Sequence, residues 1–146
     1  MTDFALDPRL ENDTHMLGNL PLCRVLLMDD RRWPWLILVP RLADVSELHD
    51  LDEAQNTLLI GELAHVSAAL KQATACLKVN TGALGNIVSQ LHIHAVARNE
   101  GDPGWPGPVW GHGERQPYSP GELSDIADPV SRAILGEHAA GAANVH

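Results

Sequence analysis

Three polar side chains alternate with apolar ones in the segment QLHIHAVAR, residues 90–98. Successive side chains of a strand point to opposite faces, so Gln90, His92 and His94 should share one face, about 7 Å apart from one to the next. A strand that directs three polar groups to one side either lies on a solvated surface or lines a site. Because two of the three groups are imidazoles, the chemistry of such a site has to be considered.

Nucleophilic attack on phosphorus is one chemistry that suits this arrangement. An imidazole can attack phosphorus and leave again, which divides one difficult displacement into two easier steps through a phosphoramidate. The attacking nitrogen must be unprotonated, and a hydrogen bond from the other ring nitrogen to a carbonyl would hold that tautomer. In this interpretation His92 attacks, while Gln90 and His94 donate hydrogen bonds to phosphate oxygens.

Two other interpretations stay open from these residues alone. A pair of histidines separated by one residue on a strand is often a structural or surface pair. Alternate strand histidines also suit Zn²⁺, although the sequence nominates no convincing third ligand for the metal.

The composition limits the possible partners. The 146 residues are 45% hydrophobic, which suits one domain with one core over residues 1–146. The net charge of −9 and the presence of only two lysines, Lys71 and Lys78, oppose a stable nucleic-acid complex, because phosphate-backbone affinity depends on clustered basic side chains. No apolar run approaches the length of a membrane span, and the start MTDFALDPRL lacks the features of a signal peptide, so we expect a cytoplasmic protein that does not bind membranes.

The order of the expected elements is typical of an α+β fold. Apolar residues recur at intervals of three and four between Asp52 and Thr74, which predicts a long helix capped by Asp50 or Asp52. Segments rich in Val and Leu predict four strands, the last two separated by a loop with two glycines, at residues 22–30, 33–41, 76–86 and 87–98. We therefore expect an antiparallel sheet, with a hairpin at its start and the long helix across one face.

The beginning of the chain predicts a short helix over residues 4–19. Asp7 would be its N-cap, Pro8 would occupy the first helical position, and Gly18 would close it. Two cysteines, Cys23 and Cys76, lie in apolar stretches and are expected to be buried thiols.

The composition changes after residue 98, where the stretch NEGDPGWPGPVWGHG is too rich in Gly and Pro for regular structure. Residues 101–146 are expected to form an irregular C-terminal extension, with a short helix beginning near Asp128 and Pro129 and a frayed end. Trp105 and Trp110 are expected to anchor this loop or fill an interface, although either could stack on a base.

The segment NTGALGNIVSQLHIHAVAR resembles the histidine triad (HIT) family, whose mark is three histidines that alternate with apolar residues after a glycine-containing loop. The likeness extends back through LLMDDRRWPWLILVPR and the long helix, and covers about residues 20–100. It implies an HIT-like antiparallel sheet and long helix in a two-fold homodimer. It also implies that His92, at the middle position, is the nucleophile and that His94 binds phosphate oxygens. Gln90 departs from the family pattern, giving QxHxH in place of HxHxH.

The same resemblance suggests roles for residues outside the triplet. Asp29 matches the family position that holds ribose hydroxyls, although an Asp in a hairpin turn is an equally simple interpretation. Asn80 matches an amide that contacts phosphate or leaving group, and Asn86 lies in the loop whose backbone N–H groups would face the phosphate. Ile87 and Ala43 occupy positions where members of the family often carry a hydroxyl residue and another histidine.

Together these observations predict a nucleotide hydrolase or nucleotidyl transferase that acts at an α-phosphorus through a nucleotidyl-histidine intermediate. The substrate would be a small nucleotide phosphoester, polyphosphate or phosphoramidate. No cofactor should be required, because the histidine supplies the nucleophile and polar groups stabilise the charge. The alternative is a nucleotide-binding dimer with little or no turnover.

Overall fold

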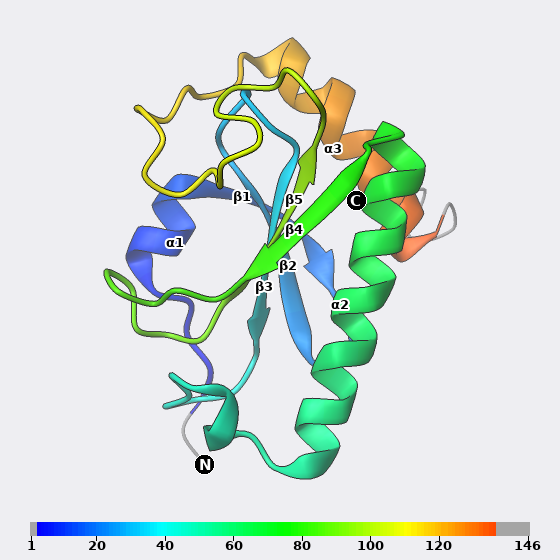
Figure 1. Ribbon diagram of the computed structural model, residues 1–146. Helices are drawn as coiled ribbons and strands as arrows, with labels where there is room; N and C mark the ends of the chain where they lie inside the picture. The colour runs from blue at the N-terminus through cyan, green and yellow to red at the C-terminus, as the bar shows by residue number, and fades with distance from the viewer. Residues whose placement is uncertain (1–2, 137–146) are drawn as a thin grey trace.

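An antiparallel sheet of five strands lies at the centre of the molecule (Figure 1). The structure is a computed structural model that describes residues 3–136, so the end expected to be frayed lies outside the described residues. The strands lie in the order β1-β2-β3-β5-β4, and every neighbouring pair is antiparallel. Their bounds are β1 Thr14–Asn19, β2 Cys23–Met28, β3 Trp35–Pro40, β4 Lys78–Gly82 and β5 Ile93–Arg98. The predicted α+β fold and the hairpin of β2 and β3 are confirmed.

The long helix α2 spans Glu53–Thr74, close to its predicted bounds, and covers one face of the sheet (Figure 1). Asp52 is the N-cap: it accepts a hydrogen bond from the backbone N–H of Gln55, whose side chain accepts one from the Asp52 N–H. A single 3₁₀ turn, η1, precedes the helix at Leu48–Asp50. Apolar side chains of α2 and of the inner strand faces form the larger of two cores, in which both cysteines are buried as free thiols.

The helix predicted over residues 4–19 is much shorter than expected. Helix α1 spans Pro8–Asp13, capped by Asp7 as predicted, and the chain then turns into strand β1. Non-local pairing with β2 satisfies the backbone of this segment and outweighs its local helical preference. Gly18 does not close a helix. A Cβ at this position would lie 2.6 Å from Cδ1 of Leu135, so the glycine allows the C-terminal helix to pack against β1.

That C-terminal helix, α3, spans Pro120–Leu135 and begins well before its predicted start near Asp128. Ser119 caps it in a reciprocal pair with Glu122, and Pro120 occupies the first turn, where a missing N–H leaves no bond unmade. This capping pattern was the sequence signal that we missed. Helix α3 packs against α2 (Figure 1), and no helix within residues 3–136 is long and apolar enough to cross a membrane.

The sheet face away from α2 carries the second core, which contains the buried side chains of Trp33 and Trp35. Apolar residues of the N-terminal segment and of the irregular loop after β5 contribute to this core. The loop is held by Arg98, whose buried guanidinium forms an ion pair with Asp102 and donates a hydrogen bond to the carbonyl of Gly107. This face of the sheet is where the candidate site lies.

Candidate active site

His92 and His94 lie together on the sheet face away from α2. His94 pairs with Ile37 of β3, a residue of the second core, and with Gly82 of β4, so its side chain shares their face. The strand begins only at Ile93, later than predicted, and His92 lies just before it. The two imidazole centroids are nevertheless 5.0 Å apart, which confirms that the two histidines share one side.

His92 is held in a single tautomer by the backbone. Its Nδ1 lies 2.7 Å from the carbonyl oxygen of Gln90. A carbonyl oxygen can only accept, so in the neutral ring Nδ1 carries the proton and Nε2 keeps a free lone pair. This is the arrangement that the sequence argument required for an attacking imidazole, and it leaves Nε2 as the nucleophilic atom.

His94 is held in the opposite tautomer. The indole Nε1–H of Trp35 donates to Nδ1 of His94 over 2.9 Å, so the proton of the neutral ring is on Nε2. The His94 residue is only 5% exposed. Burial penalises the charged ring, and the neighbouring His92 adds to the effect, so the pKa of His94 is lowered to about 3. His94 is therefore a neutral hydrogen-bond donor at pH 7.

A pocket of about 270 Å³ opens beside the nucleophile. It is lined by His92, by the glycine loop at residues 83–85 and by the segment 46–49. The pair of histidines thus presents one lone pair and one N–H group, which suits a phosphorus centre with anionic oxygens.

Gln90 does not lie as we expected, with its amide free for a phosphate. Its Oε1 accepts a hydrogen bond from the backbone N–H of Asp7 over 2.8 Å, and its Nε2 donates to the carbonyl oxygen of Ala5 over 2.9 Å. Both polar atoms are occupied by the N-terminal segment. The pairing of this residue with a distant segment could not be inferred from its place in the triplet.

Of the two asparagines predicted to bind substrate, Asn80 lies in a strand and Asn86 lies in a loop. Asn80 is in β4, on the same face as His94, and its Oδ1 accepts a hydrogen bond from Arg98. Asn86 is exposed in the loop between β4 and β5, and its side chain forms no hydrogen bond to another described residue. The amide N–H groups of both side chains are without acceptors among residues 3–136, and both could donate to a ligand.

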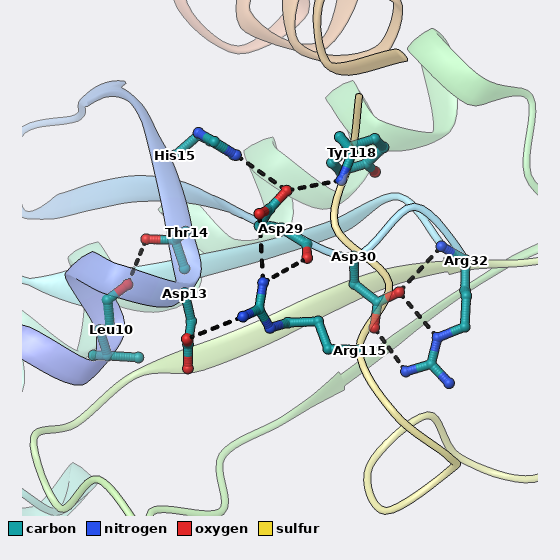
Figure 2. Close-up of polar contacts among 9 residues, drawn as sticks. All are labelled: Leu10, Asp13, Thr14, His15, Asp29, Asp30, Arg32, Arg115 and Tyr118. Atoms are coloured by element: carbon teal, nitrogen blue, oxygen red, sulfur yellow. Dashed lines mark hydrogen bonds and ion pairs between the residues drawn. The ribbon is translucent and has the colours of Figure 1, made fainter. Parts of the chain in front are cut away.

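The structure does not bring Asp29 to His92 and His94. Its carboxylate accepts a hydrogen bond from Tyr118 N–H, lies 3.1 Å from Nε2 of His15 and forms an ion pair with Arg115 (Figure 2). Burial opposes ionisation, but the Tyr118 N–H and these two neighbours hold the pKa of Asp29 below its ordinary value. This is the side of the sheet that faces α2 and α3, because His15 pairs with Leu27 of the first core.

The strand register also separates Asp29 from the site. His94 pairs with a residue of β3 that pairs in turn with Leu26 of β2, and Asp29 lies three residues beyond Leu26. Two strand spacings and three residues along a strand correspond to about 14 Å between the Cα atoms of Asp29 and His94. Asp29 thus does not lie beside the histidines, and its contacts hold the segment before α3 against the β1–β2 edge of the sheet (Figure 2).

Tryptophans contribute more to the site than the sequence suggested. No sequence signal pointed to the hydrogen bond between Trp35 and His94. The Trp110 ring lies 5.4 Å from the His94 ring and directly over Gly82, where a Cβ would be 3.2 Å from Cη2 of the indole. Trp105 lies against the guanidinium of Arg98. Both loop tryptophans thus make anchoring contacts.

The described part of the chain contains no candidate metal site. Residues 3–136 contain no group of three or more His, Cys, Asp or Glu side chains placed to hold an ion. His92 and His94 each use one ring nitrogen in a protein hydrogen bond, and no third metal ligand lies with them in the part of the chain that the structure describes.

Comparisons with known proteins agree with this geometry. A model of the HIT domain matches residues 9–101. A histidine triad protein from Sinorhizobium meliloti 1021 is 51% identical, with a TM-score of 0.87 over 89% of this chain and 96% of that one. Histidine triad proteins from Bradyrhizobium japonicum and Marinobacter aquaeolei VT8 are 44% and 40% identical, cover 91% and 92% of this chain and 99% and 98% of theirs, and both have TM-scores of 0.89. No curated protein matches. The triplet, its glycine loop and this similarity along most of the chain establish that the protein belongs to the histidine triad family.

Proposed function

We propose that the protein is a nucleotide hydrolase or nucleotidyl transferase in which His92 attacks the α-phosphorus of a nucleotide phosphoester, polyphosphate or phosphoramidate. Membership of the HIT family supports nucleotide binding and nucleotide chemistry in general. The observation that carries the specific mechanism is the hydrogen bond from His92 Nδ1–H to the Gln90 carbonyl, which leaves Nε2 free to attack.

In the first step, Nε2 of His92 forms a bond to phosphorus while the bond from phosphorus to the leaving-group atom breaks. The leaving group takes its electron pair and a proton from water. The His92 ring becomes positively charged, and the Gln90 carbonyl stabilises this charge through Nδ1–H. His94 donates Nε2–H to a non-bridging oxygen, and the side chains of Asn80 and Asn86 are further donors.

In the second step, water or another acceptor attacks phosphorus from the opposite side. The bond between phosphorus and Nε2 breaks, its electron pair returns to the imidazole, and the proton of the attacking water passes to solvent. The nucleoside monophosphate leaves and His92 regains its neutral form. No metal is needed in this scheme, and we expect turnover to persist in EDTA.

Intact-protein mass spectrometry tests the proposal. The protein is mixed briefly with adenosine phosphoramidate or a diadenosine polyphosphate and quenched at alkaline pH, which preserves a phosphoramidate. We expect a mass gain of one adenylyl group, absent in His92→Ala and retained in the control His112→Ala, which changes an exposed loop histidine. No adduct and no AMP released over hours would contradict the proposal.

A nucleotide-binding protein with negligible turnover is the second candidate. Ile87 favours it, because this 82% exposed apolar residue stands in the glycine loop where the family often carries a hydroxyl group. Isothermal titration would separate the two: binding of a nucleoside monophosphate without consumption of any phosphoester or phosphoramidate supports the second candidate.

We also propose that the protein is a homodimer. A shallow groove lies between α2 and Leu20–Pro21, and the exposed apolar side chain of Leu58 lines it. Such an apolar groove supports an interface between two copies. Light scattering after size exclusion should give a dimer for the wild type and for Met16→Glu, a 55% exposed apolar position that pairs with Leu26 on the other face of the sheet, and a monomer for Leu58→Glu.

A further inference from the structure

The segment before α1, together with the first residues of this helix, lies across the loop that leads into β5. We name residues 5–9 the N-terminal strap. It is tied to the loop at two places: through the side chain of Gln90 and through the carbonyl of Ile87, which accepts a hydrogen bond from Arg9 over 3.0 Å. These contacts join residues about eighty positions apart in sequence.

The Gln90 contact requires an amide. One side chain accepts from the Asp7 N–H and donates to the Ala5 carbonyl, so it bridges a backbone donor and a backbone acceptor of the strap. A carboxylate could accept but could not donate to Ala5, and an alanine could do neither. The two bonds therefore fix both the position and the orientation of the Gln90 residue.

The same residue supplies the carbonyl that holds the nucleophile. The backbone carbonyl oxygen of Gln90 accepts a hydrogen bond from His92 Nδ1–H over 2.7 Å. The side chain of Gln90 therefore binds the strap while its backbone binds the imidazole. A small rotation of this peptide would weaken the bond that keeps the proton off Nε2. The strap is thus connected to the attacking nitrogen through one residue.

Arg9 braces the other part of the loop. Its NH1 donates to the Ile87 carbonyl, while its Nε and NH2 are held by the carboxylate of Asp7, which also caps α1. The bonds to Asp7 therefore fix the orientation of the guanidinium that binds the loop. The strap thus holds residues 87–90 at both ends, through the Ile87 carbonyl and through the Gln90 side chain.

We propose that the N-terminal strap preorganises the nucleophile, and that Gln90 acts in this protein as a positioning residue rather than as a donor to phosphate. The catalytic consequence rests on the proposed function, whereas the effect on the His92 tautomer does not. Rigid support of a reactive group by a neighbouring layer of hydrogen bonds is a general source of rate, since small displacements of the group are costly.

The test compares Gln90→Ala, Gln90→Glu and Arg9→Ala with the wild type and with Arg31→Ala. The control removes a similarly exposed arginine side chain, 51% against 56% for Arg9, which contacts residues 116 and 122 instead of the loop. Ring ¹⁵N chemical shifts of His92 report the tautomer, and steady-state kinetics with the substrate of the mass experiment report kcat and KM. Circular dichroism confirms that each variant is folded.

In the wild type and in Arg31→Ala we expect His92 to carry its proton on Nδ1. Gln90→Ala should mix the two tautomers and lower kcat by about 10- to 100-fold with KM changed by less than about threefold, since the ligand contacts remain. Gln90→Glu and Arg9→Ala should each produce a smaller change of the same kind. Arg9 lies outside the pocket, so its effect can reach the chemistry only through the loop.

Unchanged His92 shifts and kcat within twofold of the wild type in folded Gln90→Ala and Arg9→Ala would overturn the inference. If the wild type turns over no nucleotide, the proposed mechanism fails while the ring shifts still decide whether the strap holds the tautomer.

Discussion

The stability of the protein should depend on pH through His94. The pKa of this ring is about 3 in the folded protein, mainly because the ring is buried, against an ordinary value of 6.5. Between these two values the unfolded chain binds a proton at this position and the folded chain does not. Stability must therefore fall as the pH falls through this window and be fully present above it.

The size of the effect follows from the two pKa values. Lowering the pH from 7.5 to 5.5 should remove about 1.4 kcal/mol of unfolding free energy through this one group, by proton linkage. The figure changes little for any folded pKa below about 4.5, because the folded ring is then neutral at both pH values.

Urea unfolding followed by tryptophan fluorescence measures the effect. The wild type and His94→Asn are compared at pH 7.5 and 5.5, and the change between the two pH values is taken within each protein, so that the other titrating groups cancel. The wild type should lose about 1.4 kcal/mol more than His94→Asn. Trp35→Phe removes the hydrogen bond but leaves the ring buried, so it should retain most of the wild-type difference.

Equal losses in the wild type and His94→Asn would refute this reasoning. So would an NMR titration in which the His94 ring gains its proton near pH 6.5, because burial would then not exclude the charged form.

Three further changes test other parts of the structure. Asp29→Asn should leave the Kd for a nucleoside monophosphate unchanged in titration calorimetry, because this carboxylate faces away from the histidines, and a tenfold weaker Kd would instead support the ribose contact that the family resemblance implies. Glu62→Ala should cost about 2–5 kcal/mol in urea unfolding, because two buried backbone N–H groups at the start of β2 lose their acceptor, and a cost under 1 kcal/mol would contradict this. Gly82→Val should displace the Trp110 ring, lowering stability by about 1–3 kcal/mol and shifting the fluorescence maximum; an unshifted spectrum would show that the indole does not depend on this glycine.

Local patterns in the sequence were sufficient for most of the architecture. The spacing of apolar residues predicted α2 almost to its ends, and its cap was one of two aspartates named. Alternation around the histidines placed His92 and His94 on one side. These features depend on neighbours within a few residues along the chain, and helical and strand periods are visible at that range.

Local patterns failed where a distant segment decided the outcome. Residues 14–19 have helical neighbours but become a strand, because the backbone of β2 offers them hydrogen bonds. The capping pair of Ser119 and Glu122 is, by contrast, a local pattern that marks the start of α3 directly after a segment rich in Gly and Pro.

The sequence by itself determined the chemistry that the site can perform: an imidazole at His92, a second at His94 and a glycine loop before them. The tertiary structure alone decided which nitrogen of each ring carries the proton. Trp35 from β3 and the Gln90 carbonyl set the two tautomers, and the strap occupies the amide that we had assigned to phosphate. The physical reason is that a proton position depends on the hydrogen-bond partner in space, and spacing along the chain carries no record of which partner folding will bring.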